Sequence, residues 1–218
     1  MTQALTSPAS RTEAALDLDR LSRGHLRSLH RALESFDAAA GTATRMGAVL
    51  ARRLPMGARL FVAGNGGSAA QAEHLSGEIV GRYCNDRRPF SAVALHADGS
   101  ASTAIANDYG WDEVYARQLE AHARPGDIAV LMSTSGRSAN MVAAAHRARH
   151  CGVESWALTG AAPNPLAAAS DWALTIDADT TATVQELHLV ALHLMCEAFD
   201  AELERGPSAC VDLTLERS

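Results

Sequence analysis

The chain has 218 residues, of which 47% are hydrophobic and 20% are charged, and its formal net charge is −6. This length suffices for one domain with a buried core, and the composition excludes a disordered or fibrous chain. The negative charge argues against general nucleic-acid binding, because such binding requires a basic face that releases phosphate counterions.

The sequence shows no pattern of a targeting segment or of disulfides. Residues 1–12 are polar and rich in Ala, Ser and Thr, without the apolar segment of a signal peptide. No run of residues is apolar enough to span a bilayer, so we expect a cytoplasmic protein without membrane contact. Cys84, Cys151, Cys196 and Cys210 form no C-x-x-C pair, which predicts free thiols.

The N-terminal quarter of the chain is predicted to be helical after a short tail. We expect residues 1–14 to form a flexible tail and residues 15–54 to form a helical N-terminal extension, with Gly41 between two helices. Leucines recur in this extension near helical spacing, which gives it an apolar stripe. Such a stripe must be buried somewhere, and a partner subunit is our hypothesis.

The α/β core of a single domain is expected over residues 55–205, before a second flexible tail at 206–218. We predict strands at 59–63, 91–95, 127–132, 154–158 and 172–176. We predict one helix between the first two strands, ending near 82, and further helices at 100–107, 111–123, 138–150 and 181–204, with a turn at 107–110. This alternation predicts a parallel sheet with helices on both faces, in which ligands bind at the carboxyl ends of the strands.

A loop rich in hydroxyl groups follows the third predicted strand. Ser133, Thr134, Ser135 and Ser138 lie within six residues, between a strand end and a helix. One Ser or Thr is sufficient to cap a helix, so four hydroxyl groups favour a phosphate-binding loop over a simple cap. Backbone N–H groups at the helix N-terminus would add further donors for a phosphate.

A glycine-rich loop follows the first predicted strand at residues 64–68, Gly-Asn-Gly-Gly-Ser. Glycines allow the backbone to turn sharply or to approach a ligand closely. The dinucleotide-binding pattern G-x-G-x-x-G is not matched, because Ala69 occupies the position of the third glycine, and no Walker sequence follows. We therefore expect a part of the same ligand site and no nucleotide or redox cofactor.

Candidate acid–base residues lie on two predicted helices. His74 and Glu78 are spaced i, i+4 and share one helix face, as do Gln185 and His193 on the last helix. A carboxylate and an imidazole brought together could move a proton between adjacent carbon atoms. The four side chains could also hold a divalent metal. From spacing alone, an ordinary surface pair explains His74 and Glu78 equally well.

Five motifs in chain order resemble those of the phosphoheptose isomerases, which belong to the sugar isomerase (SIS) domain superfamily. The motifs are Gly64-Asn65-Gly66-Gly67-Ser68, His74-x-x-x-Glu78, Asn107-Asp108, Ser133-Thr134-Ser135-Gly136-x-Ser138 and Gln185-Glu186-x-His188-x-x-x-x-His193. The match extends from about Leu16 to Asp200. It implies a flavodoxin-like SIS domain with a parallel five-stranded sheet, a helical N-terminal extension, and a homotetramer with active sites between subunits.

The resemblance also implies a reaction and a set of site residues. Phosphoheptose isomerases convert sedoheptulose 7-phosphate to D-glycero-D-manno-heptose 7-phosphate through an enediol(ate). The residues implied to hold the phosphate are Ser68, Ser133, Thr134, Ser135 and Ser138, and those implied to line the sugar are Asn65, Gly66, Gly67, Asn107 and Asp108, with Glu78 and Gln185 also facing the substrate. Glu78 and His193 are the implied acid–base pair, in either assignment of base and acid. In some members, zinc is held at the positions of His74, Glu78, Gln185 and His193.

Non-catalytic functions are also known within the same superfamily. The DnaA initiator-associating factor, a non-catalytic SIS-domain protein, is similar in the glycine-rich loop and in Gln185-Glu186-x-His188, but it lacks counterparts of Glu78 and His193. A sugar-phosphate sensor and an isomerase of a different ketose phosphate also stay open as functions. Because this chain has both residues of the pair, the resemblance favours an enzyme that acts on a small-molecule sugar phosphate.

Overall fold

The computed structural model describes residues 8–206, so residues 1–7 and 207–218 of the two predicted tails lie outside the described range. The strands are β1 (Leu60–Gly64), β2 (Ala92–Ala94), β3 (Ile128–Ser133), β4 (Glu154–Gly160) and β5 (Trp172–Ile176). The helices are α1 (Pro8–Glu34), α2 (Asp37–Arg53), α3 (Gly67–Val80), α4 (Gly99–Tyr109), α5 (Val114–His122), α6 (Ala139–His150), α7 (Pro165–Ala169) and α8 (Thr181–Arg205), with short 3-10 turns η1 (Leu54–Met56) and η2 (Trp111–Glu113).

The five strands form one parallel sheet in the order β2-β1-β3-β4-β5. The chain passes outward from β1 to β2 and then returns to continue from β3 to β5 on the other side. The strand order therefore reverses between β1 and β3, which is the point where sheets of this kind bind ligands. This architecture confirms the predicted flavodoxin-like fold.

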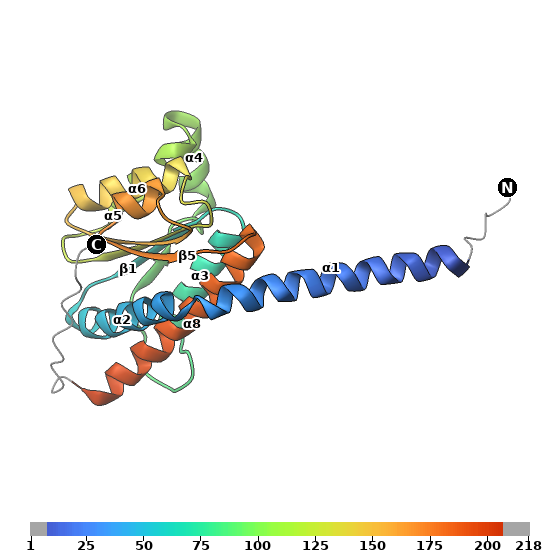
Figure 1. Ribbon diagram of the computed structural model, residues 1–218. Helices are drawn as coiled ribbons and strands as arrows, with labels where there is room; N and C mark the ends of the chain where they lie inside the picture. The colour runs from blue at the N-terminus through green and yellow to red at the C-terminus, as the bar shows by residue number, and fades with distance from the viewer. Residues whose placement is uncertain (1–7, 207–218) are drawn as a thin grey trace.

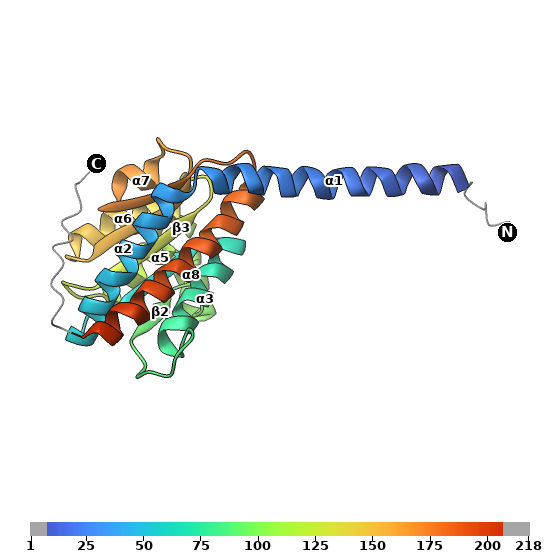
Figure 2. The same ribbon diagram turned by 60° about the horizontal axis from the view of Figure 1, so that its bottom comes forward.

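Two hydrophobic cores flank the sheet, because successive strand residues point to opposite faces. Leu60 and Val62 belong to the core beneath α2, α3 and α8, whereas Phe61 and Ala63 belong to the core beneath α5 and α6. Figures 1 and 2 show the helices in layers on opposite faces of the sheet, with α2 and α8 side by side. Because α8 packs against α2, α3 and the sheet, its inward-facing side chains are closely confined.

The predicted break at Gly41 is wrong, because the first two helices separate at Ser35 and Phe36. Gly41 lies inside α2, where glycine costs about 1 kcal/mol relative to alanine but leaves the helix intact. Phe36 is buried in the core beneath α2 and α8, so the chain changes direction where this ring enters the core. On the N-terminal side of Phe36, α1 projects from the body of the protein (Figure 1). This helix starts at Pro8, within the segment for which a flexible tail was predicted.

Two other local predictions also differ from the structure. Residues 107–109 are helical, where a turn was predicted, because α4 continues to Gly110, whose φ of 90° ends the helix. The five-residue helix α7 was not predicted, since it is too short to show a periodic pattern. It begins where the Asn164 side chain accepts a hydrogen bond from the backbone N–H of Ala167.

The described residues also bear on the cysteines and on membrane insertion. Cys84, Cys151 and Cys196 are free thiols, as predicted, and Cys210 lies outside the described range. Among residues 8–206, no helix combines the length and the apolar character needed to span a bilayer.

Candidate active site

The glycine-rich loop and the hydroxyl loop, residues 133–138, leave the sheet at the same edge. β1 and β3 are adjacent, and Gly64 pairs with Met132 in their register. Because the strands are parallel, the loops that follow them meet at the reversal point of the strand order. α3 begins at Gly67 and α6 begins at Ala139, so two helix N-termini also lie at this edge. The positive end of a helix dipole at an N-terminus favours a negatively charged ligand.

Three serine side chains converge in the hydroxyl loop. The Oγ atom of Ser133 is 2.9 Å from that of Ser138 and 3.5 Å from that of Ser135. Ser138 occupies the N-cap position of α6, yet its side chain makes no capping hydrogen bond. Thr134, in the same loop, is half-buried. Because the hydroxyl groups gather with one another instead of capping the helix, the geometry favours a ligand-binding loop.

Close packing against α8 explains the glycines of the other loop. Gly66 has a φ of 55°, a left-handed value that favours glycine. A Cβ atom on Gly67 would lie 2.0 Å from the Nε2 atom of Gln185, so the Gln185 amide rests directly on the loop backbone. Ser68 follows in the first turn of α3 and is buried. The glycine-rich loop and the start of α8 therefore lie in direct contact.

Asn65 belongs to a hydrogen-bond network that the sequence did not indicate. Its side-chain amide exchanges two hydrogen bonds of 2.9 Å with the amide of Asn140 on α6. The hydroxyl group of Tyr115 donates to the backbone carbonyl of Gly64 at 2.9 Å, and both Tyr115 and Asn140 are buried. These bonds tie the glycine-rich loop to the helix that follows the hydroxyl loop. The contact of Asn65 with a sugar stays a prediction.

The predicted acid–base residues Glu78 and His193 each lie next to His74, on facing surfaces of α3 and α8. The Nε2 atoms of His74 and His193 are 3.1 Å apart, and their rings meet edge to face. Glu78 lies one turn further along α3, and its Oε1 atom is 3.6 Å from the Nε2 atom of His74. The side chains of His74 and Glu78 are 40% and 21% exposed, so the cluster is open to a small ligand.

The same cluster offers donor atoms for zinc. Among residues 8–206, no group of three or more His, Cys, Asp or Glu side chains is already arranged around a metal position. Two nitrogen ligands of a tetrahedral zinc ion lie about 3.3 Å apart, given Zn–N bonds of about 2.0–2.1 Å. The 3.1 Å between the two imidazole nitrogens therefore fits two ligand positions. Glu78 and Gln185, the other two predicted ligands, would have to turn toward them.

Asn107 and Asp108 are exposed at the C-terminal end of α4. Their side chains bond to one another, with 2.8 Å between the Nδ2 atom of Asn107 and the Oδ1 atom of Asp108. Within the described residues, hydrogen bonds and ion pairs do not join this pair to either loop or to the histidine cluster. The contact of these two residues with a sugar stays a prediction.

Tyr83 is a neighbour of the cluster that the sequence did not indicate. Its ring lies with its centroid 5.8 Å from that of His193, tilted by 31°. Arg87, further along the same irregular segment, donates to the backbone carbonyl of Glu78 at 2.6 Å and forms a mostly buried ion pair with Asp200 of α8. These contacts fix the segment after α3 against α8. Its sequence has no periodic pattern, so only the aromatic residue shortly after Glu78 could have drawn attention to it.

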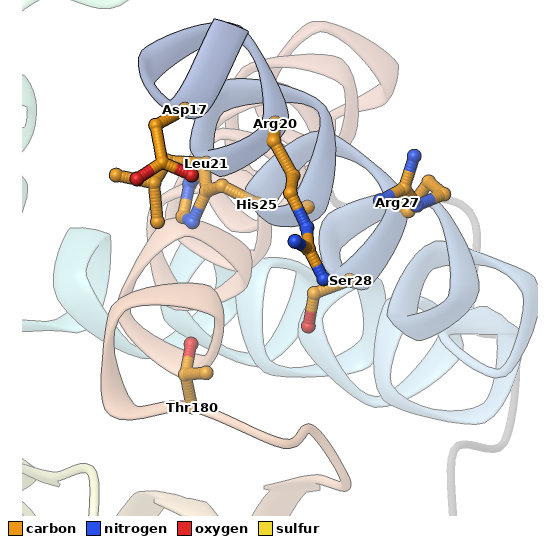
Figure 3. A pocket seen from close by; sticks show the side chains of 8 residues that line it. Asp17, Arg20, Leu21, His25, Arg27, Ser28 and Thr180 are labelled. Carbon is orange, nitrogen blue, oxygen red and sulfur yellow. The ribbon is translucent and has the colours of Figure 1, made fainter. Parts of the chain in front are cut away.

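A pocket of about 550 Å³ lies between α1 and the start of α8 and contains no residue of either loop (Figure 3). Arg20, His25 and Ser28 of α1 line it, together with Thr180 just before α8. The Nε2 atom of His25 is 2.6 Å from the Oε1 atom of Glu186. The hydroxyl group of Ser28 is buried and has no hydrogen-bond partner among the described residues. Polar groups on this face are therefore only partly satisfied within the described residues.

Comparison with known proteins gives matches that span most of the chain. Residues 25–160 match the family model of the SIS domain. The phosphoheptose isomerase of Streptomyces coelicolor is 62% identical over 183 residues, which cover 84% of this chain and 79% of that protein. The phosphoheptose isomerase of Akkermansia muciniphila is 40% identical over 167 residues, which cover 77% of this chain and 88% of that protein.

Solved structures of phosphoheptose isomerases also match most of this chain. The phosphoheptose isomerase GmhA of Neisseria gonorrhoeae matches with a TM-score of 0.78 at 36% identity, over 84% of this chain and 99% of that chain. A phosphoheptose isomerase of Francisella tularensis matches with a TM-score of 0.77 at 26% identity, over 86% of this chain and 98% of that chain. The similarity in sequence thus extends to the arrangement of the whole sheet and its helices.

Proposed function

Because the chain belongs to the phosphoheptose isomerases of the SIS domain family, we propose that it converts sedoheptulose 7-phosphate to D-glycero-D-manno-heptose 7-phosphate. Membership in this family makes it a sugar-phosphate isomerase, and the identity of the sugar is the proposal. The observation that carries the mechanism is the convergence of Glu78 and His193 from α3 and α8 on one small cluster with His74.

The hydroxyl loop is the proposed site of the phosphate group. Ser133, Ser135 and Ser138 would donate O–H groups, and backbone N–H groups at the start of α6 would add further donors. Thr134 in the same loop and Ser68 at the start of α3 complete the proposed set. All these donors are neutral, so binding of the dianion would depend on hydrogen bonds and on the helix N-termini.

The chemistry requires two groups that exchange protons with adjacent carbon atoms. A base removes a proton from C1 of the ketose, and the C–H electrons form the C1–C2 double bond of the enediol(ate). An acid returns a proton to C2, and a proton passes from O1 to O2, so no oxidant or reductant is consumed. We assign His193 as the base toward C1 and Glu78 as the acid toward C2; the reverse assignment would use the same two side chains.

We also propose that a zinc ion binds to His74, Glu78, Gln185 and His193. Imidazole nitrogen and carboxylate oxygen are suitable donors for this metal, and the spacing of the two imidazoles supports the proposal. When bound, zinc would stabilise negative charge on an oxygen of the enediolate. The Nε2 atom of His193 would have to leave the ion before it could accept a proton, because a nitrogen lone pair that is bound to zinc cannot also take up a proton. Tyr83 packs beside His193 and would limit the rotation of its ring.

We propose a cytoplasmic homotetramer with active sites between subunits. Leu18, Leu21 and Leu26 on the projecting helix α1 are 66%, 69% and 62% exposed, and such a stripe is stabilised by burial against another copy. Leu21 also lines the pocket that contains the unsatisfied Ser28 hydroxyl, so a partner there could supply a hydrogen bond. The free thiols are consistent with a reducing cytoplasm.

Turnover of a panel of ketose phosphates tests the substrate assignment. Purified protein should isomerise sedoheptulose 7-phosphate with a higher kcat/KM than fructose 6-phosphate or ribulose 5-phosphate, followed by NMR of the sugar product. A preference for one of the shorter ketoses would contradict the assigned substrate. Failure to isomerise any member of the panel would contradict the mechanism as well.

A further inference from the structure

His188 is a buried histidine of α8 that the mechanism above does not use. Its exposure is 0%, and it lies between Gln185 and His193 on the same helix. Its Nε2 atom is 3.2 Å from the carbonyl oxygen of Thr159, and its Nδ1 atom has no hydrogen-bond partner among the described residues. Because a carbonyl oxygen only accepts, Nε2 carries the hydrogen. Burial lowers the pKa of His188 to about 4, so the ring is a neutral donor near pH 7.

The carbonyl group that accepts this hydrogen bond belongs to the backbone that supports the hydroxyl loop. Thr159 pairs with Ser133 in the register of β3 and β4. The next residue, Gly160, donates its backbone N–H to the carbonyl of Thr134 at 3.0 Å. A Cβ atom on Gly160 would lie 2.3 Å from that carbonyl oxygen. The end of β4 is therefore in direct backbone contact with the loop.

Asn164 extends this support to the far end of the hydroxyl loop. Its Nδ2 atom donates to the Oγ1 atom of Thr159 at 2.9 Å, and its side chain lies against Gly136, where a Cβ atom would be 2.0 Å from the Oδ1 atom. The carbonyl of Gly136 also accepts a hydrogen bond of 2.9 Å from the backbone N–H of Leu166. Residues 159–166 thus hold the loop at two points, while none of them is a proposed ligand contact.

We propose that His188 is a positioning residue that couples the hydroxyl loop to α8, the helix that carries Gln185 and His193. The inference rests on the proposed function, because it requires the loop to bind the substrate phosphate. His188 holds Thr159 from α8, and residues 159–166 hold the loop. The phosphate and the reacting carbons are thereby placed relative to one another by a continuous path of hydrogen bonds and close contacts.

Two variants separate the hydrogen-bond donor from the volume of the ring. His188→Phe keeps an aromatic ring but cannot donate, whereas His188→Gln keeps a donor near the position of Nε2. We expect His188→Phe to raise both the KM for sedoheptulose 7-phosphate and the inhibition constant of inorganic phosphate about five- to tenfold. This factor corresponds to the loss of one hydrogen bond. The kcat should change less than KM, and His188→Gln should restore most of the wild-type KM.

A wild-type KM in folded His188→Phe would overturn the coupling. The coupling would also be overturned if the KM of both variants changed only to the extent that their melting temperatures fell. If His188→Phe does not fold, hydrogen exchange of the wild-type protein gives a second test: inorganic phosphate should slow exchange in residues 159–166 as well as in the hydroxyl loop, and protection confined to the loop would overturn the proposal. Wild-type protein that neither isomerises the sugar nor binds phosphate would refute the proposed function itself, so the two failures are distinguishable.

Discussion

Gly160→Ala should disable the hydroxyl loop by adding a single methyl group. The new Cβ atom would lie 2.3 Å from the carbonyl oxygen of Thr134, a backbone atom that cannot rotate away. An ordinary contact requires about 3.5 Å, so the end of β4 and the loop would have to separate by about 1 Å. The hydrogen bond from the Gly160 N–H to the same carbonyl would be strained by this movement.

This displacement should affect catalysis more than folding. A misplacement of about 1 Å can cost about 10²-fold in rate, whereas overpacking typically costs about 1–3 kcal/mol of stability. We therefore expect kcat/KM for sedoheptulose 7-phosphate to fall about 100-fold in Gly160→Ala, with weaker inhibition by inorganic phosphate. Steady-state kinetics and a thermal melt of the same preparation measure the two effects.

Gly77→Ala is the matched control for this experiment. Gly77 lies inside α3, and a Cβ atom there would meet no atom within 4 Å. Since alanine is the better helix former, this variant should keep wild-type kinetics and melt at the same or a slightly higher temperature. Wild-type kinetics in Gly160→Ala would refute the reasoning, because the loop would then tolerate the displacement or would not bind the substrate.

Three other predictions concern the metal, the assembly and the response to acid. EDTA should abolish the activity of protein purified without chelator and Zn²⁺ should restore it, whereas full activity in metal-free protein would exclude zinc. Leu21→Glu places a charge in the exposed stripe of α1 and should lower the mass measured by light scattering; an unchanged mass would exclude this face as the interface. The pKa of His188 is lowered by burial from 6.5 to about 4, so unfolding takes up a proton, and the free energy of unfolding should fall by up to about 3 kcal/mol as the pH drops from 6.5 to 4. Urea titrations should show that His188→Gln loses this part of the pH dependence, and an unchanged profile would contradict it.

The order of the strands and helices could be predicted because local patterns determine it. The alternation of apolar strands and amphipathic helices is visible in short windows of sequence, and so is the position of both loops at strand ends. The pairing of His74 with Glu78 follows from helical spacing alone. These features predicted the parallel sheet and the edge at which the site is formed.

Contacts between distant segments could not be predicted in the same way. The helix break near Phe36 depends on where that ring enters the core, whereas Gly41 was only a local signal. The amide pair of Asn65 and Asn140 joins residues that are 75 positions apart, and no spacing rule connects them. The hydrogen bond from His188 to Thr159 is of the same kind, since it depends on how α8 lies over the sheet.

The most direct test of the mechanism is the turnover of sedoheptulose 7-phosphate by Glu78→Gln and His193→Gln. Each variant should keep the fold and lose about 10²–10⁴-fold in kcat, because each removes one proton-transfer group. His122→Gln is the control and should retain wild-type turnover. His122 is exposed, lies far from the cluster in the sequence and has no proposed role in the site. Wild-type kcat in both Glu78→Gln and His193→Gln would contradict the assignment of this pair as the acid and base.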